Sequence, residues 1–106
     1  MQIRIKGTKI ELTLEIKDYI QGKMDMLEKY LGNTQVLNCD VEVGQAVGGQ
    51  NSGKIYRAEV NLEVPRRLLR VEKTEKDLYK AIDKVKDHLE IIIKKYRGKR
   101  IDKKRR

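Results

Sequence analysis

The chain has 106 residues and a net charge of +9, and hydrophobic and charged residues make up 39% each. Its length predicts one well-solvated globular domain, and no apolar run approaches the roughly 20 residues that span a membrane. The lone cysteine, Cys39, excludes an internal disulfide and favours a reducing cytosol, and the alternating N-terminus lacks the apolar core of a signal peptide.

The positive charge is concentrated at the C-terminus. Residues 94–106 hold nine of the 25 basic residues but only Asp102 of the 16 acidic ones, which leaves 16 basic and 15 acidic residues in 1–93. Such a block typically binds a polyanion, and the simpler alternative is a solubilising terminus. We therefore expect a domain over residues 1–97 and a basic, disordered tail over 98–106.

The first third of the chain predicts a strand and a helix. Apolar and basic residues alternate over residues 2–6, which is typical of a short strand. Thr13 is a suitable N-cap for a helix in which apolar residues recur every three or four positions from Ile16 to Leu31. Gly32 is the expected end of this helix.

The middle of the chain predicts an antiparallel meander. Its strands are expected within residues 36–47, over 56–64 and around 69–72, with a glycine-rich hairpin loop over 44–54. Pro65 ends the second of these strands, because proline cannot donate a hydrogen bond to a sheet.

The last stretch predicts a long amphipathic helix from Asp77 to Arg97, with Thr74 as its N-cap. The order β-α-β-β-β-α then predicts a two-layer α+β domain: a four-stranded sheet, with the first strand at an edge or between the others, and two helices packed on one face. The open face of the sheet would carry a mixed set of charges: Arg4, Lys6, Arg57, Glu59, Glu63 and Arg70.

The sequence offers little for catalysis. His88 is the only histidine, so we expect it at the surface or boundary of the long helix rather than in a metal or catalytic cluster. We expect Cys39 to be a small buried hydrophobe. Gly48-Gly49-Gln50 matches the tripeptide that peptide-release factors use for hydrolysis, but within a glycine-rich loop we interpret it as turn composition. We expect no enzyme, no cofactor and no metal.

Binding of RNA fits the basic residues better, because an RNA helix is recognised mainly through its phosphates and 2′-hydroxyls. One candidate set follows the long helix and the tail: Lys80, Lys84, Lys94, Lys95, Arg97, Lys99 and Arg100. A second lies at one end of the sheet: Arg66, Arg67 and Arg70. Acidic residues interrupt the basic residues in the middle of the helix, so the hypothesis depends mainly on the basic residues at its C-terminal end.

Three stretches carry a resemblance to a known family. Residues 1–13 look like an opening strand and helix cap, 23–30 like the end of a first helix, and Asp77-Leu-Tyr-Lys-Ala-Ile-Asp83 like the start of a second helix. In these stretches the chain resembles the ribosome hibernation-promoting factors, also called ribosome-associated translation inhibitors or protein Y. The match covers most of residues 1–100, without the hairpin loop, and implies a short form or an isolated N-terminal domain.

The resemblance implies a fold like a double-stranded-RNA-binding domain and a non-enzymatic, cytoplasmic inhibitor of translation. Family members occupy the channel of messenger RNA and of A-site and P-site transfer RNA on the small subunit. The implied partners are the 30S subunit with its 16S rRNA and 70S ribosomes, with no membrane and no small-molecule substrate. Carried over by position, the rRNA-facing residues would include Lys23, Lys29, Arg70, Lys84, Lys94, Lys95, Arg97 and Lys99.

The chain departs from the family at several positions. Family members often have lysine where this chain has Met26 and His88, and Arg-Gln where it has Ile91-Ile92. Three alternatives remain open. The first is a general binder of double-stranded or structured RNA, the second a small hydrolase that uses Gln50, and the third a protein-interaction module that uses the exposed sheet.

Overall fold

A computed structural model describes the backbone of residues 1–46 and 53–105, and the side chains of 1–46 and 53–98. The elements follow in the order β1 (Arg4–Thr8), α1 (Leu14–Asp25), α2 (Glu28–Leu31), β2 (Asn38–Ala46), β3 (Ile55–Val64), β4 (Arg67–Glu75) and α3 (Leu78–Arg105). The tripeptide ending at Gln50 lies outside the described residues.

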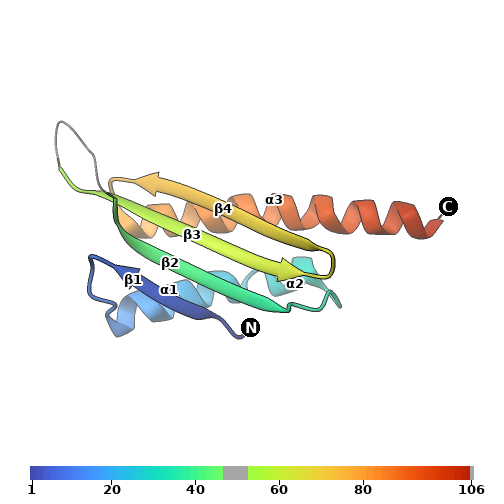
Figure 1. The fold of residues 1–106 in the computed structure, drawn as a ribbon, viewed down its shortest axis with the longest axis horizontal. Helices are drawn as coiled ribbons and strands as arrows, with labels where there is room; N and C mark the ends of the chain where they lie inside the picture. The colour runs from blue at the N-terminus through green and yellow to red at the C-terminus, as the bar shows by residue number, and fades with distance from the viewer. Residues whose placement is uncertain (47–52, 106) are drawn as a thin grey trace.

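The sheet has the strand order β1-β2-β3-β4, with β1 parallel to β2 and the other neighbours antiparallel. The helices lie on one face of this sheet, and the first strand forms an edge (Figure 1). At the β1–β2 pair, a Cβ on Gly44 would lie 2.2 Å from the carbonyl oxygen of Thr8, so this close approach requires glycine. The predicted two-layer α+β fold is confirmed.

The core lies between the sheet and the helices. Alternate residues of the strands, among them Val43, Val60 and Leu62, meet the apolar stripe of α3, which includes Leu89 and Ile93. Cys39 also faces this core, and burial raises the pKa of its thiol to about 11. The expectation of a small buried hydrophobe at this position is confirmed.

The predicted first helix is interrupted. Thr13 caps α1 as expected, because its Oγ1 accepts a hydrogen bond of 3.2 Å from the backbone N–H of Ile16. Leu27 N–H then bonds to the carbonyl of Met24 at 2.9 Å, a tighter spacing than in an α-helix, and a separate short helix follows. This turn buries Leu27 completely while the neighbouring side chain, Met26, stays exposed.

The long helix begins differently from the prediction. Thr74 is not its N-cap, because β4 continues to Glu75 and pairs Thr74 with Arg57. Asp77 caps the helix instead, and its carboxylate accepts hydrogen bonds of 2.8 and 3.3 Å from the N–H groups of Tyr79 and Lys80.

The C-terminal bound of α3 also lies beyond the predicted one. The helix continues through residue 98 to Arg105 without a break, and the division into a domain over 1–97 and a tail over 98–106 stays a prediction. No helix in the described part of the chain is long and apolar enough to cross a membrane.

Candidate nucleic-acid interface

One group of described cations lies where α2, the β3–β4 turn and the C-terminal half of α3 meet. Two hydrogen bonds hold this junction together: the Tyr96 hydroxyl donates to the carbonyl of Pro65 at 2.9 Å, and Arg97 Nη1 donates to the carbonyl of Tyr30 at 2.8 Å. Figure 1 shows α3 passing behind β4 and extending past the β3–β4 turn. We call the following residues the basic end: Lys29, Arg66, Arg67, Lys94, Lys95 and Arg97.

Tyr30 is the centre of one half of the basic end. The ammonium groups of Lys29 and Lys94 lie 5.1 and 4.8 Å from the centroid of its ring, within cation–π range. Arg97 reaches the same helix end, next to Gly32, whose φ of +58° suits glycine. A Cβ there would lie 2.9 Å from Arg97 Nη2, so Gly32 both ends α2 and leaves room for the guanidinium.

Arg66, Arg67 and Lys95 form the other half. All three side chains are exposed, and none has an ion pair or side-chain hydrogen bond within residues 1–46 and 53–98. Arg66 occupies the second position of the two-residue β3–β4 turn with a φ of +68°, a left-handed conformation that favours glycine or asparagine. These cations are therefore available to an external anion without the loss of an internal partner.

Several other predicted residues lie elsewhere and are already paired. Lys23 on α1 lies 3.2 Å from Asp83, which also accepts the Tyr19 hydroxyl; this hydrogen bond raises the pKa of Tyr19 to about 12. Lys84 pairs with Glu75, and this hydrogen bond lowers the pKa of that carboxyl. The structure thus separates Lys23 and Lys84 from the basic end and partly neutralises both.

Lys80, in the first turn of α3, is exposed and has no ion pair among the described side chains. Lys99 and Arg100 lie on the last turns of α3, and their side chains lie outside the described residues. Lys94 belongs to the basic end but shares its charge with Glu90 at 3.2 Å.

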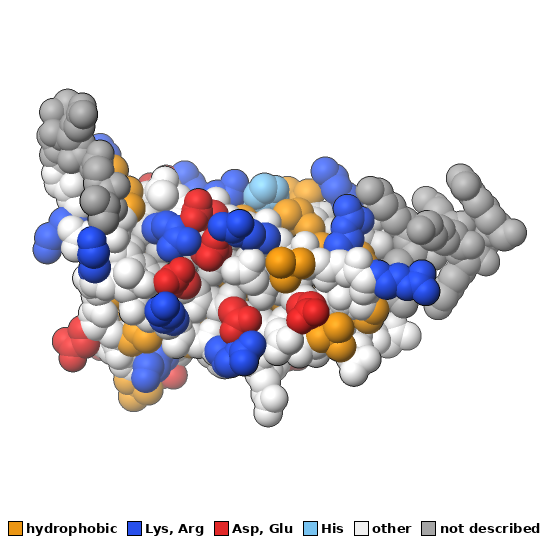
Figure 2. Space-filling view, in the orientation of Figure 1, with side chains coloured by type: hydrophobic (Ala, Val, Ile, Leu, Met, Phe, Trp, Pro, Cys, Tyr) orange, Lys and Arg blue, Asp and Glu red, His pale blue; other side chains and the backbone are white. Residues whose placement is uncertain are grey.

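The open face of the sheet carries the balanced charges that the sequence predicted. Arg57 on β3 pairs with three carboxylates: Glu42 at 3.4 Å, Glu59 at 3.3 Å and Glu72. Arg70 also binds Glu59, which is only 8% exposed although it lies on this face. Figure 2 shows blue and red side chains interleaved over this face. Here the cations are matched by carboxylates, which makes the face unsuited to a polyanion.

The hydrogen bonds of Glu42 link this network to the edge strand. Its carboxylate accepts a hydrogen bond of 2.8 Å from the Thr8 hydroxyl, and this bond lowers the pKa of Glu42. The weaker hydrogen bond from Arg57 lowers the same pKa further.

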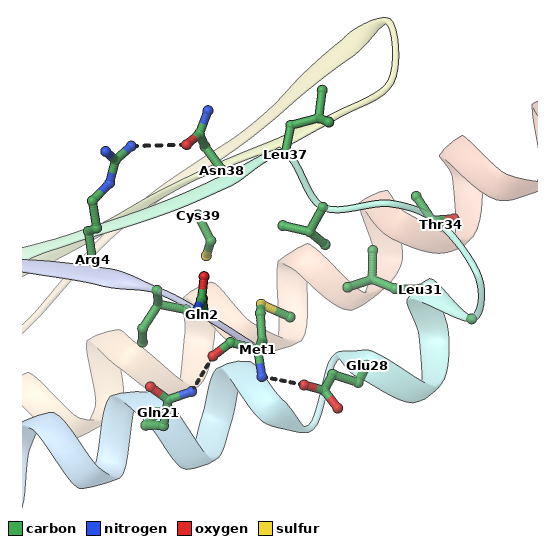
Figure 3. A pocket seen from close by; sticks show the side chains of 13 residues that line it. Met1, Gln2, Arg4, Gln21, Glu28, Leu31, Thr34, Leu37, Asn38 and Cys39 are labelled. Carbon is green, nitrogen blue, oxygen red and sulfur yellow. Dashed lines mark hydrogen bonds and ion pairs between the residues drawn. The ribbon is translucent and has the colours of Figure 1, made fainter.

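A hollow of about 950 Å³ lies between the N-terminal segment, α2 and β2. There the amino group of Met1 lies 2.5 Å from Glu28, and Gln21 donates to the Met1 carbonyl at 2.7 Å (Figure 3). The two cations of its lining already have carboxylate partners, because the Met1 amino group binds Glu28 and Arg4 binds Asp40, so this hollow is a poor site for phosphate.

His88 lies in the middle of α3 and is partly buried, at the boundary between the buried and exposed sides of the helix, as predicted. Its Nδ1 atom has no hydrogen-bond partner in the described part of the molecule. No group of three or more His, Cys, Asp or Glu side chains able to hold a metal ion occurs among the described residues.

The sequence reasoning missed the internal partners of the cations. The i,i+4 spacing of Glu90 and Lys94 could have indicated their pair. The contacts of Arg97 with α2 and of Arg70 with Glu59 join residues far apart in the chain, and no local pattern indicates them.

The family described as Sigma 54 modulation protein / S30EA ribosomal protein matches residues 3–101. The chain belongs to this family. It is 31% identical to the ribosome hibernation promotion factor of Deinococcus radiodurans over 98 residues, which are 92% of this chain and 50% of that protein. It is also 31% identical to the factor of the same name from Bacillus subtilis over 99 residues, 93% of this chain and 50% of that protein.

One solved structure agrees with this assignment of the chain to the S30EA family, and a second shows the same fold. The N-terminal domain of Thermus thermophilus Protein Y superposes with a TM-score of 0.72 at 32% identity, over 91% of this chain and 99% of that one. A ribosomal subunit interface protein from Coxiella burnetii superposes with a TM-score of 0.71 at 16% identity, over 92% of this chain and 99% of that one, and shows the fold alone.

The chain spans about half the length of the curated relatives it matches. The family is one of ribosome hibernation factors rather than enzymes, in agreement with the expectation from the sequence.

Proposed function

We propose that this chain is the ribosome-binding domain of a cytoplasmic hibernation factor. It occupies the channel for messenger RNA and for A-site and P-site transfer RNA on the 30S subunit, and it thereby inhibits translation. The basic end binds phosphates of 16S rRNA, and the folded body blocks the channel. No catalytic step is involved.

The observation that supports this proposal most is the set of unpaired cations at the basic end. Arg66, Arg67 and Lys95 come from a turn, a strand and a helix and converge on one end of the molecule. Phosphate binding by such cations releases condensed counterions, which favours association with RNA. The names of the relatives, ribosome hibernation promotion factors, supply the ribosome as the source of that RNA.

The pairing pattern also ranks the candidate residues. Arg66, Arg67 and Lys95 bind phosphate without breaking an internal ion pair, so they contribute most. Lys29 and Arg97 follow, since Tyr30 and α2 hold them in place. Lys94 lies over the same tyrosine ring but ranks below these two, because Glu90 shares part of its charge. Four described residues contribute least: Lys23, Arg70, Lys80 and Lys84. Carboxylates already share the charges of Lys23, Arg70 and Lys84, and Lys80 lies away from the basic end.

The residues that follow the basic end extend its charge. Lys99 and Arg100 come directly after it, and further Lys and Arg residues continue to the C-terminus. We propose that they contact rRNA phosphates as well and add a largely sequence-independent electrostatic contribution to binding.

Sedimentation tests the proposal directly. The purified chain is centrifuged with 30S subunits, 50S subunits or a free RNA duplex, at low and moderate salt. We expect association with 30S subunits that weakens steeply with salt and is lost when messenger RNA and initiator transfer RNA fill the channel. Binding to 30S subunits that these ligands leave unchanged would contradict occupation of the channel. Equal affinity for free duplex would instead indicate a general RNA-binding protein.

A further inference from the structure

A groove of about 310 Å³ lies between β4 and the C-terminal half of α3. Three cations line it, Arg67, Arg70 and Lys95, together with an apolar wall. Its volume falls at the lower end of the range of roughly 300–1,000 Å³ that is typical of small-molecule sites. The groove thus joins the cations at the sheet end to those of the long helix, which the sequence places in two separate sets.

We propose that this groove binds one unstacked nucleotide of an RNA strand. The base lies against the apolar wall, and the adjoining phosphate lies between Arg67 and Lys95. The inference rests on the proposed function and deepens it, because it adds a site for a base to an interface that otherwise reads only phosphates.

Charge favours a nucleotide over a neutral ligand. Among the described side chains, no acidic residue lines the groove, and Arg67 and Lys95 have no internal ion-pair partner. Arg70 is held by Glu59 through Nε at 2.9 Å and Nη2 at 2.5 Å, and its Nη1 takes part in no hydrogen bond of the described residues. A phosphate would therefore meet cationic donors without displacing a carboxylate.

The apolar wall favours a base in addition to a phosphate. Leu69 and Tyr96 are 4% and 6% exposed, and Ile92 is partly buried against the core. Leu68, the neighbouring lining residue, is 57% exposed, although leucine is costly to leave in water. Unstacked bases bind in this way, against apolar or aromatic side chains next to cations.

The wall is also held in place. Tyr96 lies on α3 and its hydroxyl binds the carbonyl of Pro65, so helix and hairpin keep their spacing. A rigid groove loses little entropy when a base enters, which favours affinity.

The test uses methyl NMR on the intact chain, with a hexa-adenylate RNA and an abasic phosphate-backbone hexamer of equal length as probes. We expect the RNA to shift the methyl signals of Leu68, Leu69 and Ile92, and the abasic hexamer to leave Ile92 unchanged. We expect Lys95→Gln and Arg67→Gln to raise the Kd for the RNA by about tenfold each, as typical of one charged contact. Lys17→Gln, the same change at an exposed lysine of α1, should alter it less than twofold.

Equal shifts with both probes would overturn the inference and leave an anion patch. Displacement of the RNA by an acidic peptide that shifts the same methyl groups more strongly would also overturn it, in favour of a protein partner. Binding to 30S subunits is measured separately. If the Ile92 signal stays unchanged with RNA while 30S binding is intact, the groove inference fails alone. If RNA fills the groove but the chain does not bind 30S subunits, the proposed function fails and the nucleotide site remains.

Discussion

The open sheet face and the basic end both display arginine and lysine, yet their charges are arranged in opposite ways. On the sheet, Arg57 lies among three carboxylates, and Arg4 and Arg70 each have an acidic partner. At the basic end, Arg66, Arg67 and Lys95 have none among the described side chains.

The difference shows that the number of basic residues does not identify a polyanion-binding surface. A cation that already binds a carboxylate must lose or share that bond before it binds phosphate, and the net gain is small. An unpaired cation exchanges only water and counterions. We therefore expect the sheet network to stabilise the fold, and we propose the basic end as the surface that binds RNA.

The largest expected effect follows from removal of the unpaired charges. The triple variant Arg66→Gln, Arg67→Gln, Lys95→Gln should weaken 30S binding roughly 100-fold and reduce the slope of log K against log salt by about 2 to 3. Co-sedimentation over a salt series measures both quantities. The matched control is Arg4→Gln on the sheet face, where Asp40 already binds the guanidinium at 2.7 Å. Similar losses in the two variants would remove the distinction between the two regions.

The reverse experiment affects the sheet. Arg57→Gln leaves Glu59 nearly buried beside Glu42 and Glu72, so the free energy of unfolding should fall by about 1–3 kcal/mol. Urea denaturation measures this loss. Affinity for 30S subunits, measured where the variant is fully folded, should change less than twofold. A loss of affinity comparable to that of the triple variant would mean that the sheet face contacts RNA.

The pH dependence of stability sharpens the same contrast. The Thr8 hydroxyl and then Arg57 lower the pKa of Glu42 below its ordinary 4.5 in the folded state. The resulting stabilisation is present above pH 4.5 and is lost as pH falls through the lower folded pKa, because protonation then favours the unfolded chain. We expect the free energy of unfolding to decline in that range. In Thr8→Val, which removes the first hydrogen bond, the decline should be shallower; an unchanged profile would contradict this role of Glu42.

The smallest expected effect separates stability from binding at one residue. Arg66→Gly relieves the left-handed backbone, and glycine's greater freedom in the unfolded chain offsets part of the gain, so stability should rise by at most about 1 kcal/mol. Affinity for 30S subunits should fall a few-fold, since one phosphate contact is lost. Thermal unfolding and sedimentation of the same sample measure the two changes. A variant that is more stable and binds as well would show that this arginine has no part in binding.

Much of the fold was predictable because local patterns specify it. The alternation in residues 56–64 predicted β3, the three-and-four spacing of Leu89 and Ile93 predicted α3, and Thr13 predicted the start of α1. The errors occurred where tertiary contacts override local preference. Pairing with Arg57 keeps Thr74 in β4, so Asp77 caps α3 instead. Between α1 and α2, the chain turns and buries Leu27, which interrupts the predicted single helix.

The candidate interface was predictable only as a list of basic residues. The element order, the core stripe and the concentration of charge from Lys94 onward can be read from the sequence alone, since composition and periodicity are local properties. The tertiary structure decided which cations are free, because ion pairs such as Arg70 with Glu59 and contacts such as Arg97 with Tyr30 join distant segments. It also brought Arg67 and Lys95 to one groove, since only the packing of α3 against β4 sets that distance.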